Sequence, residues 1–210
     1  MPLNFPYPVD FLSHHIRETA IPLALRRFDE SSGSGDGRVW SARMAPPLWT
    51  ATLPLVARSS AEARAIDAKI LALDGMGKAF LWADRSYSPA AGGTAGQYVS
   101  VSSISADRTA VVLSGLPAGY EVSIGDRLSL THGSGRVSLA TFSAPAVADA
   151  SGNTDAVEVY PYLPLWADVG QAVEMDRPCV KMCVEAYTGF MAMPGQYSHG
   201  ASLSLLQRVT

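Results

Sequence analysis

Cysteine and histidine are both scarce in this chain of 210 residues, which narrows the kinds of site that it can hold. The two cysteines, Cys179 and Cys183 in "CVKMC", share one face of a strand but lie too far apart along it for a disulfide in regular geometry. We interpret both as buried apolar residues. A metal site would need two further ligands, and no ligand spacing surrounds the four histidines, His14, His15, His132 and His199. The sequence therefore predicts neither a disulfide nor a metal site.

Basic residues and long apolar runs are lacking as well. Lys and Arg number 16 against 19 Asp and Glu, so a net charge of −3 offers no basic footprint for nucleic-acid phosphates. No window approaches the roughly 20 apolar residues that cross a bilayer. The first residues, "MPLNFPYPVDFLSHHIRETA", show no basic segment followed by an apolar run. We therefore expect no nucleic-acid binding, no membrane span and no secretion signal.

Motifs of common catalytic and nucleotide-binding sites are absent too. The chain has no G-x-S-x-G, no H-E-x-x-H, no P-loop and no G-x-G-x-x-G after a strand. "GSGDG" at residues 33–37 lacks the lysine and the following helix of a phosphate cradle. The paired histidines near Asp10 are neighbours only in sequence, and no EF-hand spacing is found among Asp149, Asp155 and Glu158. We predict no catalytic residues, no cofactor and no enzymatic activity.

What the chain does contain is alternating apolar and polar residues, the pattern of half-buried strands. Leu23 and Leu25 alternate with polar or small residues, and Pro22 suggests an edge position for that strand. Residues 29–38, "DESSGSGDGR", are typical of a flexible loop. Alternation resumes over residues 39–44 and 48–56 across a break at Pro46 and Pro47, and the apolar face of the second run is Trp49, Ala51, Leu53 and Leu55.

A single helix is expected over residues 60–74, in "SSAEARAIDAKILALDG". Ser59 followed by Glu62 forms a capping box, and Asp74-Gly75 provides a left-handed stop. The apolar residues Ile66, Ile70 and Leu73 recur at helical spacing, so they should pack on the sheet that carries Trp49, Leu53 and Phe80.

The character of the sequence changes between residues 95 and 175. Short β runs alternate with turns such as "HGSGR" and "ADASGNTD" about every ten residues, which indicates a small β-barrel or sandwich. Flanking Pro/Gly-rich stretches favour an insertion into a domain formed by both chain ends. We predict a mainly β fold with a β-sheet domain and one packed helix in residues 1–94 and 176–210, and an inserted β-barrel in residues 95–175.

Aromatic residues follow one of the expected barrel strands, in "YPYLPLW". Tyr160, Tyr162 and Trp166 could form a stacking surface for a sugar or a base, although core and interface packing explains them as well. They are the candidate binding surface, and they leave open a carbohydrate- or receptor-binding module as an alternative function.

Taken together, residues 46–209 resemble the distal tail proteins of long-tailed phages and related phage-like elements. The resemblance is carried by "PPLWTATLPLVARSSAEARAIDAKILALDGMGKAFLWADRSY", by "GLPAGYEVSIGDRLSL" and by "DASGNTDAVEVYPYL" with "DRPCVKMCV". It is a likeness of pattern, in the order of strand, capped helix, glycine turns and closing strands, and it includes no catalytic signature.

The resemblance implies a tail-tube-like β-sheet domain that closes into a homohexameric ring, with an inserted barrel that is OB-like in some members. Such a ring is a structural part of the virion at the phage tail tip, assembled in the host cytoplasm. Its partners would be further copies of itself, the tail tube protein and the baseplate hub protein. DNA would pass through the lumen without specific binding, and acidic side chains are expected to be biased toward that lumen.

Overall fold

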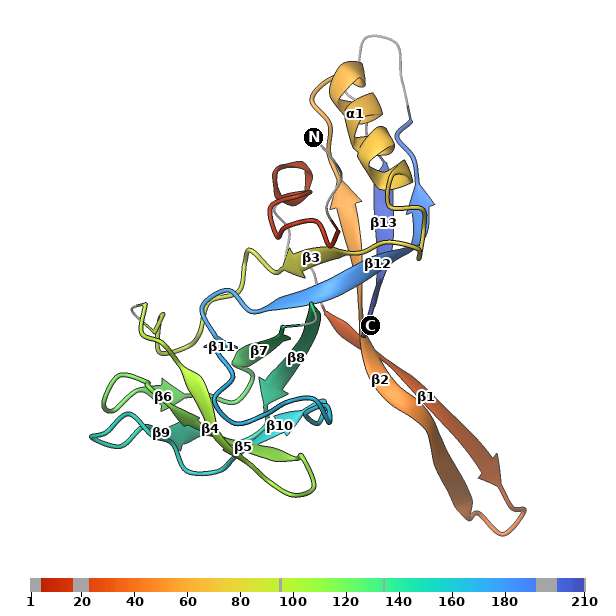
Figure 1. Ribbon diagram of the computed structural model, residues 1–210. Helices are drawn as coiled ribbons and strands as arrows, with labels where there is room; N and C mark the ends of the chain where they lie inside the picture. Colours follow the sequence, from red (N-terminus) through yellow and green to blue (C-terminus); the bar gives the residue numbers. More distant parts are fainter. Residues whose placement is uncertain (1–4, 17–22, 95, 134, 192–199, 210) are drawn as a thin grey trace.

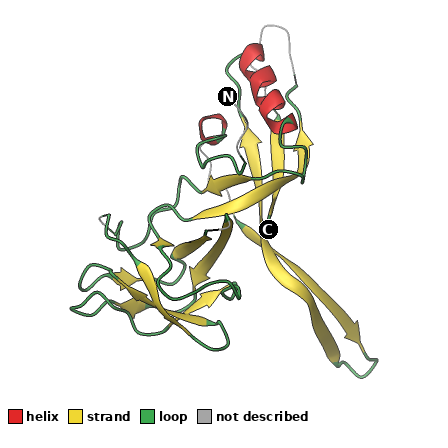
Figure 2. Cartoon of the chain, in the orientation of Figure 1, coloured by secondary structure: helices red, strands yellow, loops and turns green. Residues whose placement is uncertain are grey.

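The computed structural model describes residues 5–16, 23–94, 96–133, 135–191 and 200–209 (Figure 1). Within them the structure is mainly β, with one α-helix and one short 3₁₀ turn (Figure 2). It has two main sheets, each with its own buried apolar cluster. The expected mainly β class is confirmed.

The first sheet is assembled from both ends of the chain. Its five strands are antiparallel in the order β1-β2-β13-β12-β3. They comprise β1 (Ala24–Gly33), β2 (Val39–Leu55), β3 (Phe80–Ala83), β12 (Cys179–Thr188) and β13 (Ala201–Gln207). The expected apolar face of β2 is buried, since Trp49, Ala51, Leu53 and Leu55 all belong to its core cluster. β1 lies at an edge, as expected for that segment, whereas Pro22 itself falls outside the described residues.

Helix α1 (Ser60–Leu71) covers the buried face of this sheet. The Ser59 hydroxyl accepts a hydrogen bond from the Glu62 N–H, and the Glu62 carboxylate in turn accepts one from the Arg58 N–H rather than from the cap residue. The helix ends three residues before the predicted 74, because a turn from Ala72 leads to the left-handed Asp74. The expected packing is nevertheless confirmed: Ile66, Ile70 and Leu73 are buried with Trp49, Leu53 and Phe80.

The segment before β1 closes one edge of the sheet. The Tyr7 N–H donates to the Ala79 carbonyl at 3.1 Å, and the Leu81 N–H donates to the Tyr7 carbonyl at 2.8 Å. Tyr7 therefore acts as a short extra strand beside β3. The 3₁₀ turn Ser13–His15 follows, and the Val56 N–H donates to the His15 carbonyl at the end of β2.

The second sheet curls into a barrel. Its order is β11-β7-β8-β10-β5-β4. β6 and β9 form a separate two-stranded sheet, and Val122 of β6 belongs to the same core cluster. The bounds are β4 (Ser100–Ile104), β5 (Ala110–Ser114), β6 (Glu121–Val122), β7 (Arg127–His132), β8 (Arg136–Phe142), β9 (Ala146–Val147), β10 (Val157–Tyr160) and β11 (Val173–Glu174). Its two end strands meet, because the Val101 N–H donates to the Gln171 carbonyl at 2.9 Å and the Val173 N–H donates to the Val99 carbonyl at 2.9 Å. A barrel in this part of the chain was expected; the exact boundaries at residues 95 and 175 stay a prediction.

The barrel is tied to the first sheet by buried contacts. The indole N–H of Trp49 donates to the Leu139 carbonyl at 2.7 Å, and the Leu139 side chain joins the core of the first sheet. Nearby, Arg127 of β7 pairs with Asp84 at 3.1 Å and donates its backbone N–H to the Tyr87 hydroxyl at 2.7 Å. Burial raises the pKa of Tyr87 to about 12. These contacts join parts of the chain that no local pattern connects.

Two local expectations were wrong. Of residues 29–38, which were expected to form a loop, only 34–38 do so, whereas 29–33 belong to β1. β1 and β2 pair as a long hairpin, from Ala24 opposite Thr50 out to Gly33 opposite Val39. Pro46 and Pro47 do not break β2, because the missing N–H groups of these prolines fall at a register shift between the two strands.

The cysteines also differ from one another. Cys183 is buried as predicted, whereas Cys179 is only partly buried because it begins β12 next to the barrel, where its N–H donates to the Ser129 hydroxyl.

Candidate functional site: the hydroxyl face and the hairpin arm

The face of the first sheet opposite the helix carries small polar side chains, and we call it the hydroxyl face. Its central rows place Thr52 opposite Ser204, and Thr50 opposite Leu206. The next row pairs Ser202 with Thr188 of β12. The threonines and serines are partly or largely exposed, whereas Leu206 is buried. Strand alternation sends the apolar neighbours of these hydroxyl residues into the core beneath the helix.

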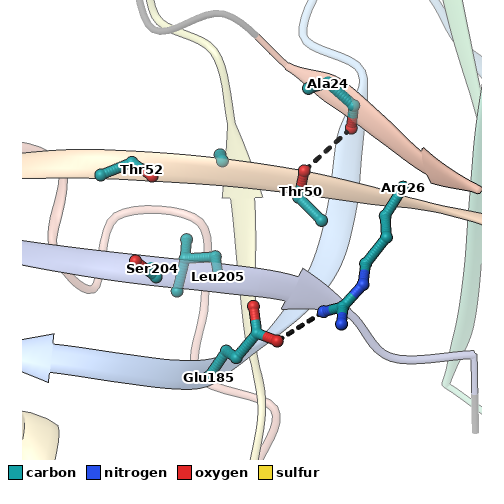
Figure 3. A pocket seen from close by; sticks show the side chains of 8 residues that line it. Ala24, Arg26, Thr50, Thr52, Glu185, Ser204 and Leu205 are labelled. Atoms are coloured by element: carbon teal, nitrogen blue, oxygen red, sulfur yellow. Dashed lines mark hydrogen bonds and ion pairs between the residues drawn. The ribbon is translucent and has the colours of Figure 1, made fainter.

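A shallow groove of about 570 Å³ lies on this face (Figure 3). Ala24, Thr50, Thr52 and Ser204 line it, together with an ion pair at its rim. In that pair the Arg26 guanidinium donates to the Glu185 carboxylate at 2.5 Å, with 48% and 40% of the two side chains exposed. The groove thus has neutral hydroxyls along its floor and a compensated charge at its edge.

The distal half of the β1–β2 hairpin extends away from the other strands of the first sheet and from the barrel (Figure 1). We call its residues 27–45 the arm. It exposes large apolar side chains, with Val39, Trp40 and Met44 at 72%, 68% and 64% of their full accessibility. Isolated two-stranded ribbons are marginal in water, and exposed aromatic residues on such a ribbon indicate a surface that is covered by a partner. The arm therefore gathers three exposed large apolar side chains on one hairpin strand.

The arm also carries short-range charge pairs. Asp29 lies within 3.7 Å of the Arg27 guanidinium and within 3.8 Å of that of Arg43. At the tip, Asp36 lies 3.5 Å from Arg38. All these side chains are at least 32% exposed, so each pair contributes little stability by itself.

The predicted aromatic surface is only partly brought together. Tyr160 and Tyr162 contact each other with ring centroids 5.5 Å apart and planes at 88°, so the two ring faces do not form one flat platform. The Arg27 guanidinium lies 5.7 Å from the Tyr160 ring centroid. Trp166 instead packs on the barrel core, against His132 at 5.8 Å. Only Tyr162, at 50%, is markedly exposed.

The polar residues that sequence analysis weighed and set aside have local roles. Asp149 accepts hydrogen bonds from the N–H groups of Ser151 and Asn153, and the Asn153 bond is the main reason that the pKa of its carboxyl is lowered. The His15 imidazole lies 3.2 Å from the Glu62 carboxylate at the start of the helix. Across the described ranges, no three His, Cys, Asp or Glu side chains gather as a metal site would need.

Comparison with protein-family models finds no match for this chain, and a search of curated proteins finds none either. Among the described residues, no helix has the length and apolarity to span a membrane.

Sequence analysis missed the first strand of the arm because several of its residues are poor strand formers. Ser31, Ser32 and Gly33 have low β propensity, and together with the glycine-rich tip they were interpreted as one long loop. The alternation over residues 39–44 could have predicted it, because a strand that follows a glycine-rich turn commonly pairs with a strand of similar length before the turn, here before "SGDG".

Proposed function

We propose that the chain is a structural subunit of a phage tail tip, which closes with further copies into a ring between the tail tube and the baseplate hub. In this proposal the first sheet is the tail-tube-like domain and the barrel is an OB-like insertion on the outside of the ring. DNA passes through the lumen without specific binding.

The observation that carries the proposal is the hydroxyl face. An antiparallel sheet with one face closed by a helix and the other partly exposed and lined by hydroxyl groups suits the wall of a water-filled conduit. DNA that slides through a conduit must meet few fixed cations, because phosphate contacts give sequence-independent affinity. On the hydroxyl face the Arg26 cation is already paired with Glu185.

The charges on the hydroxyl face differ from the acidic lumen that the sequence led us to expect. Acidic side chains were expected to be biased toward the lumen, whereas Glu185, the carboxylate among the groove residues, is neutralised by Arg26. The proposal therefore rests on neutral hydroxyls, and the net charge of −3 per copy adds only a diffuse repulsion.

The arm supplies a contact that can hold copies together. Tyr7 occupies the outer side of β3, so a continuous sheet that runs from β3 of one copy into the next is obstructed. Side chains on the arm do not have this obstacle. In the proposal, Trp40 and Met44 of each copy pack on the neighbouring copy around the ring.

Carbohydrate or receptor binding by the barrel is less well supported. A sugar platform needs exposed ring faces and reachable polar groups. The Tyr160 hydroxyl and the Trp166 indole N–H are buried, and neither has a hydrogen-bond partner within the part of the chain that the structure describes. Tyr162 alone offers an open ring.

Electron microscopy of the purified full chain tests the ring directly. We expect closed rings of uniform subunit number, and loss of those rings in the double variant Trp40→Ser, Met44→Ser. The matched control is Val209→Ser, which removes an exposed apolar side chain outside the arm. A wild-type chain that never closes into rings contradicts the proposal, as does tight binding of labelled duplex DNA in fluorescence anisotropy at about 0.15 M salt.

A further inference from the structure

No strand among the described residues pairs with the outer side of β1. β1 ends the strand order of the first sheet, and its recorded strand partner is β2. The opposite end of the sheet is different, because Tyr7 hydrogen-bonds along β3. A long strand with one unpaired side is a template for pairing with another chain, unless its side chains oppose that pairing.

The charges along this edge form a self-complementary series. Residues 26–30 read Arg-Arg-Phe-Asp-Glu. If two copies of β1 pair antiparallel about Phe28, Arg26 stands opposite Glu30 of the second copy and Arg27 opposite Asp29. Both halves of the pairing are equivalent, so four opposite-charge pairs form and no like charges meet. Opposite charges directly across an antiparallel ladder stabilise it, and like charges destabilise it.

Side-chain alternation sorts these pairs onto two faces. Arg26, Phe28 and Glu30 share one face by strand periodicity, and the Arg26 guanidinium indeed lies 5.6 Å from the Phe28 ring centroid. Arg27 and Asp29 lie on the other face. A two-fold pairing would therefore place Phe28 against its own counterpart, flanked by charge pairs on both sides.

The geometry of the hairpin leaves room for the second copy. The two register shifts near Phe28 add their extra residues to β2, since Arg26 opposes Leu48 whereas Asp29 opposes Arg43. β1 itself keeps one residue per ladder position. In this register Gly33 of one copy falls opposite Leu23 of the other, so the two bodies lie toward opposite ends of the paired β1 strands. The distal part of each hairpin stands off its own body (Figure 1).

We infer that β1 is a two-fold docking edge for a second copy of this chain, which joins the β1–β2 hairpins of two copies into one antiparallel sheet. The pairing is isologous and differs in symmetry from the head-to-tail contact of a ring, so in a ring it would link copies of two rings. It does not depend on the proposed function. The existing partners of the arginines are exposed and weakly held, so Arg26 and Arg27 can turn to the second copy. Where Arg26 does so, Glu185 loses the partner that neutralises it in the single copy.

Reciprocal charge reversal tests this inference. The first variant carries Arg26→Glu and Arg27→Glu, and the second carries Asp29→Arg and Glu30→Arg. Each alone sets like charges opposite one another, whereas an equimolar mixture restores opposite charges at all four positions. Arg38→Glu, at the tip and outside the series, is the control. Sedimentation velocity on the full chain compares the mass of the largest species in each sample.

We expect the wild type, the Arg38 control and the mixture to reach twice the mass of either variant alone, with self-association of each variant weaker by about tenfold or more. High salt should weaken the pairing, because exposed charges are screened. The inference is overturned if the wild type is no heavier than the variants, or if the mixture does not recover. A wild type that pairs in twos but never closes into rings would instead count against the ring alone.

Discussion

Replacing Trp49 by Phe should lower the free energy of unfolding by about 2–4 kcal/mol, although the residue belongs to no motif. The substitution removes the indole N–H that donates to the Leu139 carbonyl at 2.7 Å. β10 pairs with β8 only at Thr141 and Phe142, so at Leu139 no strand hydrogen-bonds to that side of β8 in the described structure. Without the indole the Leu139 carbonyl stays buried and unsatisfied.

Two effects make up this magnitude. A buried carbonyl left without a donor costs about 1–3 kcal/mol. The smaller phenyl ring also leaves part of the volume of the indole empty beside Leu139, and core truncations of this kind add roughly 1 kcal/mol or more. Trp49 is only 6% exposed, so water cannot take over either role.

Chemical denaturation followed by fluorescence and circular dichroism measures the effect. Trp40→Phe is the matched control, since the same chemical change on the exposed arm should stay within about 0.5 kcal/mol. In Trp49→Phe we also expect the unfolding transitions seen by fluorescence and by circular dichroism to differ in midpoint, because the barrel and the first sheet then share fewer contacts. Equal stability of the two variants would refute the role that we give to this contact.

Three further predictions concern stability. Ile70→Asp should cost several kcal/mol in thermal melting, because it buries an unpaired carboxylate under the helix, and an unchanged melting temperature would contradict the packing. Gly115→Ala should lower the free energy of unfolding by about 2–4 kcal/mol, because Gly115 has φ +85° and a Cβ there would lie 2.2 Å from the Tyr98 carbonyl oxygen. Gly125→Ala is the control: Gly125 also has a positive φ but lies in open space, so the loss of stability should be clearly smaller. Burial lowers the pKa of His15 in the folded chain. As the pH drops below about 6.5, the unfolded chain therefore binds a proton at His15 before the folded chain does, and the free energy of unfolding should fall. In denaturation titrations, His15→Gln should lose that part of the pH dependence.

The sequence by itself determined the features that depend on neighbouring residues. The capped helix followed from Ser59, Glu62 and the spacing of Ile66 and Ile70, because capping and helical periodicity act within a few residues. The buried face of β2 followed from strict alternation for the same reason. The short runs and turns after residue 95 predicted a barrel without showing how its end strands would meet.

Tertiary structure decided what depends on residues far apart in the chain. The arm exists because β2 offers ladder hydrogen bonds to a serine- and glycine-rich segment that has little strand propensity, and such pairing overrides local preference. The contact between Trp49 and Leu139 joins residues 90 positions apart, and Tyr7 closes the edge of β3 across a similar gap. Which strand edges and sheet faces stay open is set by such long-range contacts, and the proposed assemblies depend on those open surfaces.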